Sequence, residues 1–413
     1  MLRDKIPRYR FIKHVLVICV SIFAITAYLY NASPRKIIFG ISSDTIFENE
    51  NLRVEQIDSI PRLAVSYNIN GAVYATEDHY VFRKVQKQNF FTELGHFDKV
   101  DPDFTQRAKD FIARLRITRD LRNNFGANNI VVLKSNTILI FYDKIYQSVD
   151  QGVSFQAVFD FKEKGVYQPF DQGIAVDQND NVYFGEYDCT SRPNKIRIIK
   201  GSKDGTLWSI FYEFSPGEIF HIHSIEYDSF RDILWISSGD RDEESKLMYI
   251  DKSRKNVEVL GAGDQGWRIV SLITTKEFLY WCSDNDRAGS NIYRYNFSNN
   301  EREKLGFVGK PSYYSTQMKD GTLVFSTTFE PSSPYSKSFN PEPTTDLWIS
   351  KNGKEWYKVL SVLGKIYESK YGPSRPTLIL PGGDYSSDYL FLTPISTLNS
   401  DFSTKILQIT WKR

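Results

Sequence analysis

The stretch Ile233-Leu234-Trp235-Ile236-Ser237-Ser238-Gly239-Asp240 is a short apolar run that ends in a turn dipeptide and a carboxylate. A short apolar run that is rich in β-branched and aromatic residues and bounded by turn residues is typical of a buried strand. Further stretches share this pattern at 71–78, 138–143, 182–188, 279–284, 323–330 and 389–393. The chain therefore carries a recurring strand unit.

The spacing of these units predicts an all-β fold. Later units follow one another at roughly 45 to 60 residues, which suits the four-stranded blade of a β-propeller. We predict seven blades, with six as the alternative if the first unit is misjudged. The first interval is longer because residues 103–122 show a helical pattern of apolar residues, and residues 331–345 are expected to form a long loop over one face.

Closure of the ring needs one more strand. The last unit ends at residues 405–411, one strand short of a full blade. We predict that residues 36–40 near the N-terminus supply the missing strand, because closure removes an exposed sheet edge.

The composition bears on the class of partner and on the kind of secondary structure. The chain has 413 residues, with 52 basic and 50 acidic side chains and a net charge of +2. A balance this even argues against a nucleic-acid partner, which would require a basic face. Aromatic residues make up 15% of the chain, and Tyr and Phe suit a pleated, half-buried surface.

The N-terminus has the pattern of a membrane anchor. Residues 1–13 carry five basic side chains and one acidic side chain, and the run that follows is apolar and uncharged. We predict a transmembrane signal anchor at residues 14–31, with residues 1–13 in the cytoplasm and residues 32–413 as an extracytoplasmic domain. A cleaved signal peptide and a buried helix are the alternatives.

Three cysteines place few constraints on the fold. Cys19 lies in the apolar run, whereas Cys189 and Cys282 lie in the predicted propeller and permit one disulfide. The chain has no CxxC pair, so a structural zinc site is not expected.

One motif is more specific than the strand pattern. Ser148-Val149-Asp150-Gln151-Gly152-Val153-Ser154-Phe155 has the form S-x-D-x-G-x-S/T-aromatic, and residues 350–356 form a weaker copy with Asn in place of Asp. The motif resembles the Asp-box (BNR repeat) of sialidase-like β-propellers. This resemblance implies a propeller fold in which the motif is a structural turn. It does not extend to the active site, because no Arg-Ile-Pro motif precedes the first unit.

The candidate site surrounds a histidine pair. His221 and His223 alternate along a predicted strand, so both imidazoles should lie on one face. Strand ends of successive blades should meet near the central channel, and the polar residues expected there are Glu186, Asp240, Gln265, Arg268, Asp284 and Glu330. Of these residues, we predict that His221, His223, Glu186, Asp240, Arg268 and Glu330 carry catalysis. They offer a general acid and base, or ligands for a divalent cation, although the sequence requires no cofactor.

Two hypotheses about function follow. The first is a membrane-tethered enzyme, a glycoside hydrolase or polysaccharide lyase that acts on an extracytoplasmic glycan. The second is a non-catalytic propeller that binds glycan or protein in surface assembly. Fold alone does not separate them, because propellers host both kinds of protein.

Overall fold

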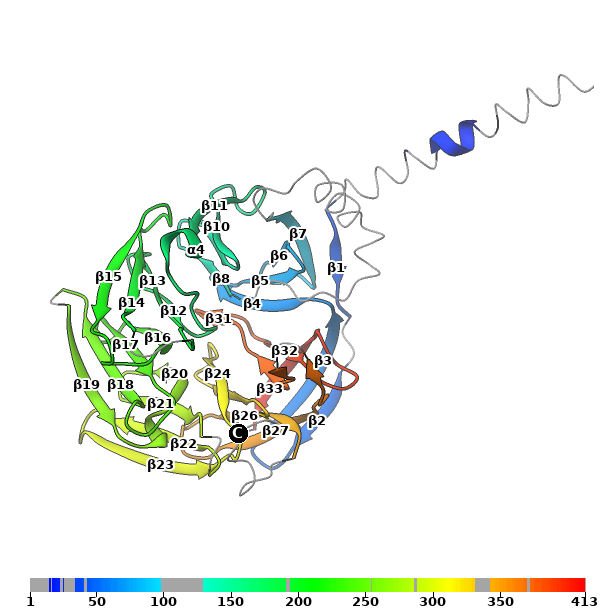
Figure 1. The fold of residues 1–413 in the computed structure, drawn as a ribbon. Helices are drawn as coiled ribbons and strands as arrows, with labels where there is room; N and C mark the ends of the chain where they lie inside the picture. Colours follow the sequence, from blue (N-terminus) through cyan, green and yellow to red (C-terminus); the bar gives the residue numbers. More distant parts are fainter. Residues whose placement is uncertain are drawn as a thin grey trace, which may run out of the picture. The chain divides into compact units, whose positions relative to one another are not determined.

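A computed structural model describes residues 15, 17–22, 25, 34–40, 43–97, 129–190, 194–253, 255–285, 288–330, 342–369 and 372–412 (Figure 1). The chain divides into two compact units. The first consists of Met1–Ile37 and Lys99–Asn123, and the second consists of Ile38–Asp98 and Asn124–Arg413.

In the first unit, the described residues between 15 and 25 are helical. Their apolar side chains are exposed, for example Val17 at 62% and Val20 at 60%. Among the residues that the structure describes, no helix has both the length and the apolar character needed to cross a membrane. The rest of the expected anchor and the expected helix at 103–122 lie outside the described residues.

The second unit is a seven-bladed β-propeller, as predicted. Its first three blades are antiparallel sheets of consecutive strands. Blade 1 contains β4 (Ala64–Ile69), β5 (Ala72–Glu77), β6 (Tyr80–Lys84) and β7 (Phe90–His96). Blade 2 contains β8 (Asn129–Val132), β9 (Ile138–Phe141), β10 (Lys144–Ser148) and β11 (Gln156–Asp160), and α4 (Phe161–Lys164) follows it. Blade 3 contains β12 (Ile174–Val176), β13 (Val182–Gly185), β14 (Ile196–Gly201) and β15 (Trp208–Phe214).

The next three blades repeat this order. Blade 4 contains β16 (Ile222–Asp228), β17 (Ile233–Ser238), β18 (Lys246–Asp251) and β19 (Asn256–Ala262). Blade 5 contains β20 (Ile269–Thr274), β21 (Phe278–Ser283), β22 (Asn291–Asn296) and β23 (Glu301–Phe307), and the short helix η1 (Gln265–Trp267) precedes it. Blade 6 contains β24 (Ser312–Gln317), β25 (Leu323–Thr327), β26 (Thr344–Ser350) and β27 (Tyr357–Leu363).

Blade 7 joins the two ends of the unit. From the centre outward it contains β30 (Thr377–Ile379), β32 (Leu390–Ile395), β33 (Ser403–Trp411), β3 (Leu52–Pro61) and β2 (Asp44–Glu48). The closing strands therefore come from residues 44–61, and the prediction that residues 36–40 close the ring is wrong. Phe39 instead donates its N–H to Asn89 O in blade 1 at 3.0 Å. Strand β1 (Lys36–Ile38) precedes this contact.

The recurring apolar runs are the second strands of the blades. In β9, β13 and β25 every residue is buried, because these strands are covered on both faces by the neighbouring blades. The outermost strands β19 and β23 are mostly exposed or half-buried. The continuous apolar pattern therefore marks the second strand of each blade, which is buried on both faces.

A short segment ties blade 7 to blade 1. Strand β31 (Gly382–Gly383) pairs in parallel with Tyr67 and Asn68 of β4. Gly383 has φ of 89°, and a Cβ there would lie 2.4 Å from Asn68 O, so a side chain is excluded. A separate small hairpin consists of β28 (Glu368–Ser369) and β29 (Gly372–Pro373). Of the expected 331–345 insertion, residues 331–341 lie outside the described residues.

The Asp-box motif forms the turn between the third and fourth strands of blade 2. Asp150 Oδ1 accepts the Ser154 N–H at 2.9 Å, and Ser148 Oγ accepts the Gly152 N–H at 2.7 Å. Hydrogen bonds from the Ser154 hydroxyl, the Ser154 N–H and the Ser148 hydroxyl lower the pKa of Asp150 to about 2. Phe155 packs against the core of the blade.

The weaker copy occupies the equivalent turn of blade 6. There, Asn352 Oδ1 accepts the N–H groups of Lys354 and Glu355, both at 2.9 Å. A third turn of this kind was not recognised from the sequence. It joins β14 to β15 in blade 3, where Asp204 Oδ1 accepts the Thr206 hydroxyl at 2.8 Å. Hydrogen bonds from Ser202 and Thr206 lower the pKa of Asp204 to about 2.

Candidate functional site

The histidine pair lies at the start of the innermost strand of blade 4. His221 and His223 are 0% and 2% exposed, and their Nε2 atoms are 2.7 Å apart. The pairing of β16 with β17 shifts register between Ile222 and Ser224, so His223 is an extra residue in the ladder. Only Ile222 separates the two histidines, so alternation along the chain directs both imidazoles to the same face.

Asp240 completes this cluster from the turn after β17. Gly239 has φ of 85°, and a Cβ there would collide with the backbone of Glu244, so the tight turn requires glycine. This turn places Asp240 Oδ1 3.3 Å from the Nε2 atoms of both His221 and His223. The Asp240 side chain is 37% exposed, so the cluster has one open side.

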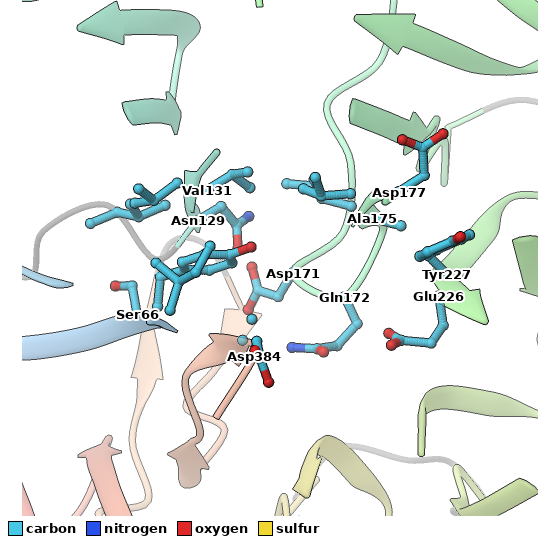
Figure 2. Close-up of a pocket in the computed structure, with 18 of the residues that line it drawn as sticks. Ser66, Asn129, Val131, Asp171, Gln172, Ala175, Asp177, Glu226, Tyr227 and Asp384 are labelled. Carbon is cyan, nitrogen blue, oxygen red and sulfur yellow. The ribbon is translucent and has the colours of Figure 1, made fainter. Parts of the chain in front are cut away.

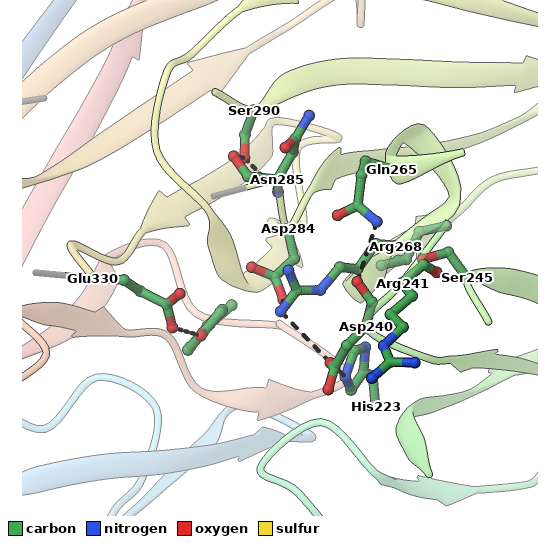
Figure 3. A network of polar contacts seen from close by, with 12 residues as sticks. His223, Asp240, Arg241, Ser245, Gln265, Arg268, Asp284, Asn285, Ser290 and Glu330 are labelled. Atoms are coloured by element: carbon green, nitrogen blue, oxygen red, sulfur yellow. Dashed lines mark hydrogen bonds and ion pairs between the residues drawn. The ribbon is translucent and has the colours of Figure 1, made fainter. Parts of the chain in front are cut away.

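Blade 5 contributes an ion pair that lies beside Asp240. Arg268 follows η1, and its Nη2 atom is 3.1 Å from Asp284 Oδ2 and 3.5 Å from Asp240 Oδ1. Asp284 follows β21, and its N–H donates to Arg268 O at 2.8 Å. Figure 3 shows the Arg268 guanidinium between the two carboxylates, with His223 beneath Asp240. We call His221, His223, Asp240, Arg268 and Asp284 the polar cluster.

The two histidines of the polar cluster have opposite pKa shifts. Burial disfavours the charged form of His221, but its hydrogen bond to Asp240 and its contact with Cys189 outweigh burial and raise its pKa to about 9. At His223 burial dominates, and its pKa falls to about 4. Burial alone would raise the carboxyl pKa of Asp240, yet the two imidazoles hold it well below its ordinary value.

The polar cluster can hold a divalent cation. Two imidazole nitrogens and a carboxylate oxygen, separated by 2.7, 3.3 and 3.3 Å, converge on one point. The circle through these atoms has a radius of about 1.8 Å, and a metal–ligand bond to nitrogen or oxygen is about 2.1 Å. One ion can therefore contact all three atoms and keep an open side for water or substrate. This donor set suits first-row divalent metals.

Gln265 lies beside the polar cluster. Its Nε2 donates to Asp240 O at 3.1 Å and to Asp242 Oδ1 at 2.9 Å. Its Oε1 is buried and has no hydrogen-bond partner among the described residues, and the same holds for Nδ1 of His223. Buried polar atoms of this kind are expected to bind a water or a ligand.

The two remaining predicted residues, Glu186 and Glu330, are engaged elsewhere. Glu186 is fully buried, and its oxygens accept hydrogen bonds from the Arg197 side chain and from the N–H groups of Tyr167 and Arg197. Glu330 accepts the Tyr313 hydroxyl and lies 3.5 Å from Arg375 Nη1. Figure 3 shows Glu330 apart from Asp240, on the far side of Asp284.

Aromatic residues that the sequence did not indicate pack beside the polar cluster. The half-buried rings of Phe170 and Tyr187 lie 4.7 Å apart, and Tyr187 lies 4.5 Å from the His221 ring. Phe170 also contacts Tyr313, with ring centroids 5.7 Å apart. Tyr187 directly follows Glu186, which was expected at a strand end near the central channel. Its place in the sequence could therefore have indicated that its ring lies near the histidine pair.

The two propeller cysteines do not form a disulfide. Cys189 and Cys282 are both free thiols, one exposed and the other buried. Cys189 Sγ contacts Nδ1 of His221 at 3.7 Å.

A cavity of about 390 Å³ lies between the innermost strands of several blades. None of the predicted site residues lines this cavity, although His223 belongs to β16, which also carries the lining residue Glu226. Asp171, Gln172, Glu226 and Asp384 lie around the same space in Figure 2. Burial, together with the Asp228 carboxylate, raises the pKa of Glu226 to about 8.

Comparison with known proteins supports the fold. No protein-family model matches the chain, and no curated protein sequence matches it. An oligogalacturonate lyase in complex with manganese superposes with a TM-score of 0.51 at 8% identity, over 92% of this chain and 99% of that one. A prolyl endopeptidase gives 0.47 at 9% identity, over 86% and 50%. TolB from Acinetobacter baumannii gives 0.37 at 13% identity, over 84% and 81%. At 8% identity, the likeness to the oligogalacturonate lyase shows the fold alone.

Proposed function

We propose that the propeller binds a divalent cation at His221, His223 and Asp240 and uses it to process an acidic glycan. The convergence of three ligand atoms beside Arg268 carries this proposal. A cation and a guanidinium at one opening can together neutralise a sugar carboxylate. The half-buried rings of Phe170 and Tyr187 offer apolar surface for a sugar ring. The oligogalacturonate lyase with manganese is a fold-level analogy in the same direction.

The arrangement favours elimination over hydrolysis. Most glycoside hydrolases use two carboxyl groups, one of them as a proton donor to the leaving group. Glu186 and Glu330 were the candidates, but Arg197 holds the first, and Tyr313 and Arg375 hold the second. In a β-elimination, hydroxide from the solvent takes the proton beside the sugar carboxylate, and the electron pair of that C–H bond forms the new double bond. The C–O bond to the leaving sugar breaks with its electron pair on the sugar oxygen, which takes a proton from water. The cation and Arg268 would stabilise the negative charge that develops on the carboxylate.

Glycan binding without catalysis is the second candidate. The engagement of Glu186 and Glu330 favours it, because a binding protein needs no free acid or base. In both cases we propose that residues 14–31 anchor the chain in a membrane with the propeller outside the cytoplasm. The exposed apolar side chains of Val17, Val20 and Ile22 support this anchor.

Incubation of the purified chain with acidic oligosaccharides tests the proposal. With Mn²⁺ present, we expect products with the ultraviolet absorbance of a new carbon–carbon double bond, and His223→Ala should reduce their rate at least tenfold. Glu243→Gln removes an exposed charge from the loop after Asp240 and serves as the matched control. Mn²⁺-dependent binding without products would favour the second candidate. The proposal fails if acidic oligosaccharides neither bind nor react.

A further inference from the structure

The two histidines of the polar cluster differ at the nitrogen that faces away from Asp240. Nδ1 of His221 is 3.7 Å from Cys189 Sγ. Nδ1 of His223 is buried and has no hydrogen-bond partner among the described residues. Among the described residues, polar groups therefore contact both ring nitrogens of His221 but only Nε2 of His223.

This difference matters for cation binding. A neutral imidazole binds a metal through the nitrogen without a proton, so binding at Nε2 requires the proton on Nδ1. With a cation at Nε2 of His221, its Nδ1–H group would face the Cys189 sulfur, a weak acceptor that would favour this tautomer and ring orientation. Groups in this position commonly change metal affinity by 10- to 100-fold. The Tyr187 ring packs against the same imidazole at 4.5 Å and limits its rotation.

The thiol is also open to chemistry. Cys189 is exposed, and the other propeller cysteine, Cys282, is 1% exposed. A low-molecular-weight disulfide can therefore reach Cys189. In this exchange the S–H bond of Cys189 and the S–S bond of the reagent break, and a mixed disulfide and a free thiol form. The added group would take up the space between the sulfur and His221.

We propose that Cys189 is a positioning residue for His221 and that mixed-disulfide formation at Cys189 weakens cation binding at the polar cluster. This inference rests on the proposed function, because it concerns the affinity of the same site. It also makes the site responsive to the thiol–disulfide balance of its surroundings.

The test measures Co²⁺ binding to the full chain in detergent, in a Cys19→Ser background that removes the other exposed thiol. The Co²⁺ visible absorption band reports the ligands, and a titration gives the affinity. We expect Cys189→Ala to bind Co²⁺ at least tenfold more weakly, and Cys189→Ser to stay within about threefold of the parent. A small disulfide reagent should weaken the parent, dithiothreitol should restore it, and Cys189→Ser should not respond.

The outcomes separate the two ideas. Equal affinity and an unchanged band in Cys189→Ala, with the parent binding Co²⁺, would refute the role of Cys189 and leave the cation site intact. Failure of the parent to bind Co²⁺ would refute the cation site itself, and the inference with it. Thermal unfolding of each variant shows whether a lost affinity reflects a lost fold.

Discussion

Replacement of Asp240 by Asn removes one negative charge from the polar cluster with almost no change in shape. Its Oδ1 is 3.3 Å from both imidazole Nε2 atoms and 3.5 Å from Arg268 Nη2. A neutral amide is a much poorer ligand than a carboxylate. We therefore expect the Kd for Mn²⁺ to rise at least 100-fold, which corresponds to about 2.7 kcal/mol.

The same change should also lower stability, because two buried imidazoles lose their carboxylate partner. The side chain of Asp240 is 37% exposed, so water can replace part of what it loses. Arg268 keeps Asp284 as its partner at 3.1 Å. The loss of this charged partner costs about 1–3 kcal/mol in the free energy of unfolding, which lowers Tm by several degrees and leaves the chain folded.

Calorimetric titration with Mn²⁺ and thermal unfolding with and without Mn²⁺ measure both quantities on one sample. The parent should gain Tm as Mn²⁺ is added, because a ligand that binds only the folded state stabilises it. Asp240→Asn should not gain Tm, whereas Glu243→Gln should behave as the parent. If Asp240→Asn binds Mn²⁺ as tightly as the parent, the assignment of the three ligand atoms is refuted.

Three further predictions concern the rest of the chain. Asp150→Ala should lower the free energy of unfolding by roughly 0.5–1.5 kcal/mol, because the turn loses the acceptor of the Ser154 N–H, and the affinity for Mn²⁺ should not change. Denaturant titration measures the free energy of unfolding. A changed Mn²⁺ affinity with unchanged stability would contradict a purely structural turn. Glu226 keeps its proton in the folded chain up to a pH of about 8, whereas an unfolded glutamate loses it near 4.3. The contribution of Glu226 to stability therefore falls as the pH rises from about 4.3 to about 8, by up to about 1.4 kcal/mol per pH unit. Glu226→Gln should flatten the dependence of the free energy of unfolding on pH. Identical pH dependence in both chains would contradict the raised pKa of Glu226. Deletion of residues 1–33 should give a folded protein that needs no detergent, as judged by circular dichroism and gel filtration, and a truncated chain found only in aggregates would count against the anchor.

The sequence was most informative where a strand is buried on both faces. Trp235 and Trp281 belong to runs that are apolar at nearly every position, and all seven such runs are second strands. The closing strand β3 was missed because its buried positions, Leu52, Val54, Ile57 and Ile60, lose alternation at a bulge between Gln56 and Asp58.

The candidate site shows the same division. His221 and His223 could be placed together from alternation, and Asp240 from its place at a strand end. The sequence could not show that Glu186, at an equivalent strand end, is held by Arg197, because that contact joins two strands of blade 3 through side-chain reach. Cys189 gave no signal, since its importance depends on a contact with another blade.

Blade 7 also has a consequence for biosynthesis. Thr404 in β33 donates a hydrogen bond to Leu63 O, 341 residues earlier in the chain, and β3 pairs with β33 along its length. During synthesis, β3 emerges early with its partner β2, and its other edge stays unpaired until β33, the last strand, has been made. Such an edge can pair with other chains, and contacts of this sequence separation form slowly. We therefore expect nascent and C-terminally truncated chains to depend on chaperones far more than the finished ring does.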